Sequence, residues 1–297
     1  MVSRAGILFA FVCCATSAGA SAQQVEANGD TGRLVELASP AARVVSLAPF
    51  LTELVYAAGA GNKLVAVSSF SDYPAEAKNK PVIGDASAID MERLVALRPD
   101  LVIAWKSGGH PAATQQLIEF GMQVFLVNAE HIADVPRLLR SIGRLAGTQA
   151  TADAAAEKFE QRLTALRQRY AANPRQKVFF EIWHNPLITV NGKHYISEAM
   201  EICGGRNIFS SVATLVPTVG LESIYAANPQ VIFSGTSMGD ADAKKPWFAH
   251  QKLQAVMQGN IFALDPDLIQ RQTPRLLDGV ERICRALEGT SRTTFTN

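Results

Sequence analysis

The chain has 297 residues, of which 48% are apolar and 19% are charged, so it can bury a large core and is not a disordered protein. It contains 28 lysines and arginines against 27 aspartates and glutamates, a balance that argues against a nucleic-acid backbone or an anionic membrane as its main partner. Its four cysteines are too few for a disulfide scaffold, and its length suits about two domains.

Residues 1–22 have the composition of a cleavable signal peptide. Arg4 gives a positive start, residues 7–12 form an apolar run, and Ala20-Ser21-Ala22 offers the small side chains that a signal peptidase reads. The apolar run is too short to cross about 30 Å of hydrocarbon comfortably, so we favour a signal peptide over a membrane anchor. We expect cleavage after Ala22 and export of the mature chain.

Cleavage would leave two cysteines, Cys203 and Cys284, because Cys13 and Cys14 lie within the signal. In an oxidising compartment such a pair persists as a disulfide. Two buried free thiols are the alternative.

The mature chain begins with a leader segment over residues 23–42, for which we expect a loose structure. An N-terminal α/β lobe follows over residues 43–147, and its alternating strands and helices favour a mainly parallel sheet. We expect Pro49 to end the first strand and Thr52 to cap a helix that runs to Gly59. The predicted strands are 43–47, 64–67, 101–104 and 124–127, and the later predicted helices are 91–97, 112–120 and 135–145.

A long helix is predicted next, because residues 151–172 contain no glycine or proline and repeat large apolar residues at helical spacing. Such a helix would be ~33 Å long, enough to cross a domain. We expect a connecting helix over residues 148–173, with Pro174 ending it. A C-terminal α/β lobe is expected over residues 174–290, followed by a tail at 291–297.

The two predicted lobes share an internal signature. Residues 91–103 align without gaps with residues 221–233, and both read as a helix, a proline turn and a buried strand. A second echo joins residues 124–127 with 261–264. Two echoes in the same order suggest a duplicated unit. Two similar lobes that face each other would create a cleft, which is a common place for a small ligand.

The sequence contains no common catalytic motif: G-x-S-x-G, G-x-x-x-x-G-K-[ST] and H-E-x-x-H are all absent. No two histidines stand four residues apart or in a compact ligand motif. The histidines are His110, His131, His184, His194 and His250. We therefore expect a binding protein rather than an enzyme, with no resident metal and no catalytic cofactor.

Five stretches between residues 43 and 287 carry a resemblance that covers nearly all of this range, in order. They are RVVSLAPFLTELVYAAG (43–59), LVAVSSFSDYPAEA (64–77), MERLVALRPDLVIAW (91–105), EICGGRNIF (201–209) and RQTPRLLDGVERICRAL (271–287). Together they resemble the periplasmic cobalamin (vitamin B12)-binding proteins of ABC importers, part of a helical-backbone metal-chelate receptor superfamily that also binds haem and iron-siderophores. The resemblance implies an α/β fold with two Rossmann-like lobes joined by a single long α-helix, the class III periplasmic binding protein fold.

The resemblance also implies ligand-binding residues in the cleft between the lobes. Pro49, Trp105, Asp267 and Arg271 match family positions that touch ligand, and Phe70 lies where the family has an aromatic residue. Trp105 ends a predicted strand, from which its side chain can project into a cleft, although core packing is the alternative.

The sequence departs from the family at three pocket positions. Ala86 and Val216 stand where the family has tryptophans beside the corrin ring, and Ile188 stands at a phenylalanine position. Three other residues offer replacement surface: Phe50, Trp183 and His184. His184 would be either a hydrogen-bond donor or an axial ligand to a metal centre.

Glu92 and Glu222 match the family's two acidic residues, one on each lobe, that dock on arginines of the permease. Duplicated lobes would present one carboxylate each to a twofold-symmetric partner. Helix-start glutamates favoured by the helix dipole are the alternative. Cys203 and Cys284 match the family's disulfide.

We therefore expect a monomeric periplasmic protein that captures cobalamin or a related corrinoid and delivers it to an inner-membrane ABC permease dimer without any reaction. The stiff helix should limit closure of the lobes to a small rocking motion. Three alternatives stay open: a haem or iron-siderophore binder of the same fold, a binder of free zinc or manganese, and a secreted enzyme.

Overall fold

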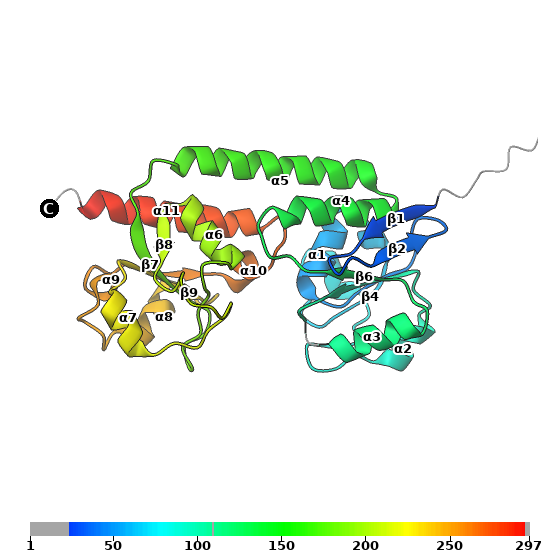
Figure 1. Ribbon diagram of the computed structural model, residues 1–297, viewed down its shortest axis with the longest axis horizontal. Coiled ribbons are helices and arrows are strands. Elements are labelled where there is room, and N and C mark those ends of the chain that lie inside the picture. Colours follow the sequence, from blue (N-terminus) through cyan, green and yellow to red (C-terminus); the bar gives the residue numbers. More distant parts are fainter. Residues whose placement is uncertain (1–23, 109, 295–297) are drawn as a thin grey trace, which may run out of the picture.

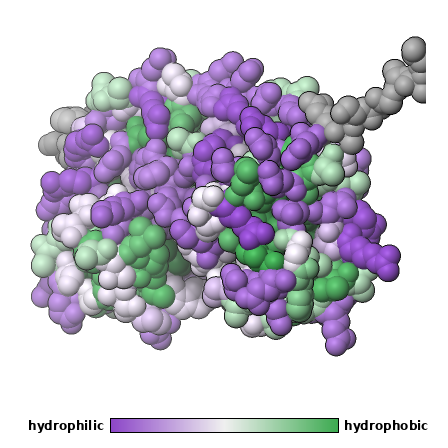
Figure 2. Space-filling model, turned by 45° about the vertical axis from the view of Figure 1, so that its right-hand side comes forward, coloured by the Kyte–Doolittle hydropathy of each residue, from purple (hydrophilic) through white to green (hydrophobic). Residues whose placement is uncertain are grey.

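The computed structural model describes residues 24–108 and 110–294, so the predicted signal peptide at 1–22 lies outside the described residues. Two α/β lobes lie side by side beneath a layer of long helices (Figure 1). In space-filling view, apolar surface gathers on both halves of one face of the molecule (Figure 2). No helix in the described ranges is long and apolar enough to span a bilayer.

Each lobe contains one four-stranded sheet and the helices that connect its strands. The N-terminal lobe consists of β3 (Val44–Ser46), α1 (Pro49–Ala57), β4 (Leu64–Val67), α2 (Met91–Ala96), β5 (Leu101–Trp105), α3 (Pro111–Glu119), β6 (Val124–Val127) and α4 (Asp134–Ala146). The C-terminal lobe consists of β7 (Gln176–Glu181), α6 (Tyr195–Ile202), β8 (Gly205–Asn207), α7 (Leu221–Ala227), β9 (Val231–Gly235), α8 (Asp240–Lys244), α9 (Gln254–Met257), β10 (Ile261–Leu264), α10 (Pro266–Ile269) and α11 (Leu276–Thr294).

The two sheets have the same topology. The strand order is β4-β3-β5-β6 in the first lobe and β8-β7-β9-β10 in the second, and all pairs within these sheets are parallel. Parallel strands need a crossover connection, which the intervening helices and loops supply. The sequence echo between residues 91–103 and 221–233 falls on α2-β5 and α7-β9, which occupy matching places. The fold class and the duplication predicted from sequence are therefore confirmed.

The long helix α5 (Gln149–Tyr170) joins the lobes. It buries one stripe at helical spacing, which includes Phe159, Leu163 and Leu166, and leaves most of its charged residues exposed. Gly147 adopts a left-handed conformation at the end of α4, with φ of 68°, and this allows the chain to reverse into α5. In Figure 1, α4 runs beneath one half of α5 and α11 beneath the other.

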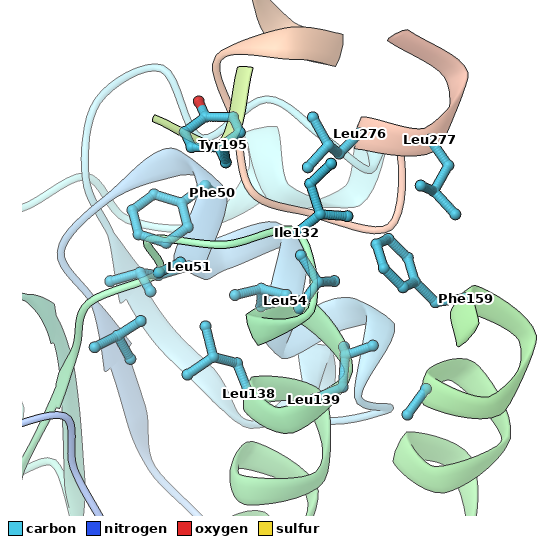
Figure 3. Close-up of a cluster of buried hydrophobic side chains, with 14 of the residues drawn as sticks. Phe50, Leu51, Leu54, Ile132, Leu138, Leu139, Phe159, Tyr195, Leu276 and Leu277 are labelled. Carbon is cyan, nitrogen blue, oxygen red and sulfur yellow. The ribbon is translucent and has the colours of Figure 1, made fainter. Parts of the chain in front are cut away.

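A single buried apolar cluster extends across both lobes (Figure 3). Leu54 of α1 and Ile132 lie in the N-terminal half of this cluster, and Leu276 of α11 and Tyr195 of α6 lie in the C-terminal half. Phe159 of α5 packs against the same cluster. The lobes are therefore packed against each other through a shared core as well as tethered by a helix.

The segment expected to be a loose leader is instead an ordered hairpin. Strands β1 (Val25–Asn28) and β2 (Leu34–Leu37) pair antiparallel, and alternate residues on each strand are buried. Asp30 fixes the turn to the first lobe, because its backbone N–H donates to the Leu126 carbonyl and its carboxylate accepts from the Asn128 N–H. The hairpin covers an apolar face beside α4.

Two further boundaries differ from expectation. Helix α1 begins at Pro49 rather than at a Thr52 cap, because proline is well suited to the first helical position. The Thr52 hydroxyl is buried and bonds the hydroxyls of Ser46 and Ser71. At the other end of the chain, α11 continues past residue 290 into the expected tail.

Candidate functional site

A pocket of about 270 Å³ opens between the lobes. Its N-terminal wall comes from the segments that follow β3, β4 and β5, so it lies at the carboxyl ends of parallel strands, where ligands bind in open α/β sheets. The C-terminal lobe contributes Gln270 and Arg271. The remaining lining residues are Leu47, Ala48, Pro49, Phe50, Ser68, Ser69, Phe70, Asp85, Ala86, Ala104, Trp105, Gly108, His110 and Thr114.

Aromatic side chains form the apolar part of this wall. Phe50 is buried and supports Trp105 edge-to-face, with ring centroids 5.7 Å apart. Trp105 remains 39% exposed, so it is not a core residue, and Phe70 is 79% exposed. Phe70 also has φ of 63°, a left-handed conformation that is costly for a bulky residue and is found mostly at functional sites.

Arg271 is held at the pocket by carboxylates from both lobes. Its guanidinium lies 2.9 Å from Glu53 of α1, 3.2 Å from Asp72 and 2.7 Å from Asp267 of α10. Its second terminal nitrogen also donates to the Phe70 carbonyl at 3.5 Å. Asp267 and Arg271 were both expected to contact ligand; Arg271 lines the pocket, whereas Asp267 does not line it and forms an ion pair with Arg271.

Glu53 is the centre of an ion network that joins the lobes and that the sequence analysis did not predict. Its carboxylate is only 2% exposed and accepts hydrogen bonds from Arg271 and, in a two-bond arrangement, from Arg275. The Arg275 guanidinium stacks on the Tyr73 ring at 3.7 Å. Burial raises the pKa of Asp267, and Arg271 opposes that rise. No local motif marked Glu53, because its partners lie more than 200 residues away in sequence.

Trp183, His184 and Val216 do not line this pocket. Trp183 and Val216 are exposed, at 62% and 44%, and they lie on two loops at the carboxyl end of β7. Ile188 pairs with both Trp183 and Thr218 and so holds these loops together. Trp183 and His184, the replacement surface expected from the C-terminal lobe, therefore lie outside the pocket.

A buried carboxylate holds His184 in place. Glu181, at the end of β7, accepts a 2.7 Å hydrogen bond from the Trp247 indole and lies 3.1 Å from Nδ1 of His184. Burial raises the pKa of Glu181, and the Trp247 and His184 contacts oppose this by stabilising the ionised form.

A second pocket, of about 580 Å³, is also lined by Trp105. Its walls come from the loop after β6 and from the start of α6, so it also lies between the lobes. His194 and Tyr195 line it, and burial lowers the pKa of His194 to about 4. The sequence analysis did not predict this pocket, because nothing local signals that these loops meet.

Glu92 and Glu222 occupy matching places in the two lobes. Each is exposed in the first turn of its helix, α2 or α7. Figure 1 shows both helices on the side of the molecule away from α5. The two helices that carry these glutamates thus lie on a common side, one on each lobe.

Cys203 and Cys284 form a disulfide that joins the end of α6 to α11, with Cα atoms 4.5 Å apart. The expected pairing is confirmed. Among the described residues no group of three or more histidine, cysteine, aspartate or glutamate side chains is placed to hold a metal ion.

The chain is similar to several known proteins. Residues 44–268 match the model of a family described as periplasmic binding protein. A vitamin B12-binding protein of Vibrio parahaemolyticus is 34% identical over 85% of this chain and 92% of its own length. The crystal structure of the periplasmic vitamin B12-binding protein BtuF of Vibrio cholerae superposes with a TM-score of 0.79 at 36% identity, covering 85% of this chain and 98% of that one. A periplasmic haem-binding protein from Pseudomonas aeruginosa is more distant, with a TM-score of 0.74 and 26% identity over 83% of this chain and 92% of that one.

Proposed function

The chain belongs to the periplasmic binding protein family, and we propose that it captures cobalamin or a related corrinoid and delivers it to an inner-membrane ABC permease dimer. The family consists of binding proteins, which confirms the expectation that the chain is not an enzyme. Cobalamin is then a transported ligand rather than a cofactor. The signal-like residues 1–22 and the family support a periplasmic location, and the chain works as a monomer.

The interlobe pocket carries this proposal. Its wall combines the exposed indole of Trp105, the exposed ring of Phe70 and the fixed guanidinium of Arg271. A corrinoid has a broad apolar body with amide groups on its rim. The aromatic wall supplies apolar contact for the body, and Arg271 supplies directed hydrogen bonds for the rim. Pro49, Phe50, Phe70, Ala86, Trp105 and Arg271 are the proposed ligand contacts, with Asp267 holding Arg271.

Calorimetry with purified mature protein tests the ligand. We expect tight binding of cobalamin and cobinamide and weak or no binding of haem and ferric siderophores. Preferential binding of haem or a siderophore would instead support the alternative that the more distant relatives suggest. Trp105→Ala should weaken corrinoid binding by about 10- to 100-fold, since a large apolar contact is worth about 1.5–3 kcal/mol. Phe120→Ala is the matched control, because Phe120 is exposed outside both interlobe pockets.

We also propose that Glu92 and Glu222 dock on arginines of the permease. Their matching places on the two lobes suit a twofold-symmetric partner, and charge-assisted pairs with arginine are among the stronger hydrogen bonds. The double variant Glu92→Ala, Glu222→Ala should bind corrinoid as the parent does while uptake in cells falls. Unchanged uptake would contradict the docking role.

A further inference from the structure

Arg271 brings the one guanidinium among the described residues that line the interlobe pocket, and carboxylates of the protein surround it. One terminal nitrogen donates to Glu53 at 2.9 Å and to Asp72 at 3.2 Å. The other lies 2.7 Å from Asp267 and donates to the Phe70 carbonyl at 3.5 Å. Both terminal nitrogens therefore have acceptors within the protein, and the positive charge is shared among three carboxylates.

The charged groups at this pocket leave it with an excess of negative charge. Arg275 adds a second guanidinium, 2.6 Å from Glu53. The lining adds the carboxylate of Asp85. Hydrogen bonds from the Ser87 hydroxyl and from the Ser87 and Ala88 backbone lower the pKa of Asp85, so it is ionised near neutral pH. Four carboxylates thus stand against two guanidiniums, a formal charge of −2 with histidine counted as neutral.

The second interlobe pocket has a charge of the same sign. Its charged lining residues are three glutamates and one lysine: Glu130, Glu198, Glu201 and Lys193. Arg167, which is not part of the lining, pairs with Glu198 at 2.9 Å, and this leaves a formal charge of −1. Because Trp105 lines both pockets, negative charge prevails in each of the two spaces that this indole borders.

A carboxylate on a ligand would bind poorly in such a cleft. It loses water on entry and needs a cation to compensate for that loss, yet the guanidinium of Arg271 is already neutralised. Walls of low dielectric strengthen its repulsion by the carboxylates of the protein. A carboxamide has no net charge and avoids this repulsion. It can still accept a hydrogen bond from the Nε–H of Arg271, for which the described residues supply no acceptor.

We propose that the cleft selects metal chelates with an uncharged rim and rejects those with rim carboxylates, and that Asp72 is a determinant of this selectivity. The inference rests on the proposed function and names the side-group chemistry that the pocket accepts. Corrinoids with amide rims meet this condition, whereas haem, with its propionates, does not. Asp72 is suited to a test because its side chain is 47% exposed, and its replacement leaves the buried Glu53 in place.

Calorimetry with cyanocobalamin and its b-, d- and e-monocarboxylates tests this inference. In each monocarboxylate one rim propionamide is hydrolysed to a carboxylate, so the isomer differs from cyanocobalamin by a single charge at one position. We expect at least one isomer to bind the parent protein about 3- to 10-fold more weakly than cyanocobalamin does. Asp72→Asn keeps the side-chain shape and removes a negative charge, so it should bring this affinity ratio closer to one. Added salt should also lower the ratio, because ions screen the repulsion.

Asp153→Asn is the matched control. Asp153 has a similar exposure, 53%, and also lies beside an arginine, Arg140, but it belongs to α5 and lines neither interlobe pocket. This variant should keep the ratio of the parent protein. If the parent binds cyanocobalamin and all three isomers equally, the charge rule is wrong; if Asp72→Asn leaves the ratio as it is, the role of Asp72 is wrong. Either result leaves the proposed function intact. Failure of the parent to bind cyanocobalamin would overturn the proposed function, and this inference with it.

Discussion

The N-terminal lobe supplies an apolar, aromatic wall to the pocket, whereas the C-terminal lobe supplies Gln270 and Arg271 from the loop after α10. Both lobes have the same strand order, so the difference lies in the loops at the strand ends. The C-terminal lobe also holds the disulfide and the buried Glu181, while the N-terminal lobe has the added β1-β2 hairpin. A duplicated scaffold has therefore kept its sheets and diverged where the halves meet.

Removal of the disulfide should have the largest effect, and it should affect the C-terminal lobe more than the N-terminal lobe. Replacing Cys203 and Cys284 with serine frees a loop with a sequence separation of 81 residues. In the chain-entropy model this lowers the free energy of unfolding by about 4 kcal/mol. Thermal unfolding should show the loss, and hydrogen exchange should show β7 and β8 losing protection before β3 and β5. Equal loss of protection in both lobes would mean that the bridge stabilises the molecule as one unit.

Acid should weaken the C-terminal lobe through His194. Burial lowers the pKa of His194 from 6.5 to about 4. Between these pH values the imidazole is protonated in the unfolded chain but neutral in the folded chain. The stability contributed by the neutral imidazole is therefore complete above about pH 6.5 and is lost as the pH falls to about 4, by about 3 kcal/mol. His194 also caps α6 by accepting from the Ile196 N–H. His194→Asn keeps a capping side chain, so its denaturation midpoints should vary less over this range.

Asp134, a carboxylate of the N-terminal lobe, should affect stability in a lower pH range than His194 does. Burial alone would raise the pKa of Asp134. Hydrogen bonds from the His131 and Glu130 backbone and from Arg137 outweigh this effect and lower the pKa. Its contribution is present above the ordinary aspartate pKa and is lost only as the pH falls through the lowered value. Asp134→Asn should therefore change the pH profile only below about pH 4. A profile altered near pH 6 by this variant would contradict the assignment.

Glu53→Gln should loosen the tie between the lobes. The change keeps the shape of the side chain but leaves Arg275 without its carboxylate, and the partly exposed partners limit the loss to about 2 kcal/mol. Denaturant unfolding measures this loss. Glu160→Gln removes a surface pair with Arg140 and should cost less than about 1 kcal/mol, which makes it the matched control. Equal losses in the two variants would show that burial of Glu53 adds nothing.

The smallest expected effect is on shape. Helix α5, the shared core and the Glu53 network together oppose opening, so solution scattering of free and loaded protein should give nearly the same radius of gyration. A change of several ångströms would show that the lobes hinge.

The sequence predicted most of the fold because the relevant signals are local. Alternating strand and helix patterns, the uninterrupted stripe in α5 and the echo at residues 91–103 and 221–233 all lie within short windows. The hairpin at residues 25–37 was missed although its strands alternate, with Val25 and Val35 buried and Glu26 and Glu36 exposed. Its strands are only four residues long and need the first lobe to cover them.

The site was harder to predict because its parts come from both ends of the chain. Family resemblance marked Arg271 and Trp105, which line one pocket. It did not mark Glu53, which lies inside an apolar helix, α1, and bonds Arg271 across a separation of 218 residues. The sequence analysis also offered Trp183 and His184 as replacement pocket surface, and only the folded structure shows that they lie outside the pocket. Contacts between lobes leave no periodic trace in a single sequence.

Arg271 has two roles, since the same guanidinium lines the interlobe pocket and bonds carboxylates on both lobes. A transporter that separates the two lobes must therefore break the ion pairs that Arg271 makes with one of them. Separation of the lobes and release of the ligand would then occur in the same step.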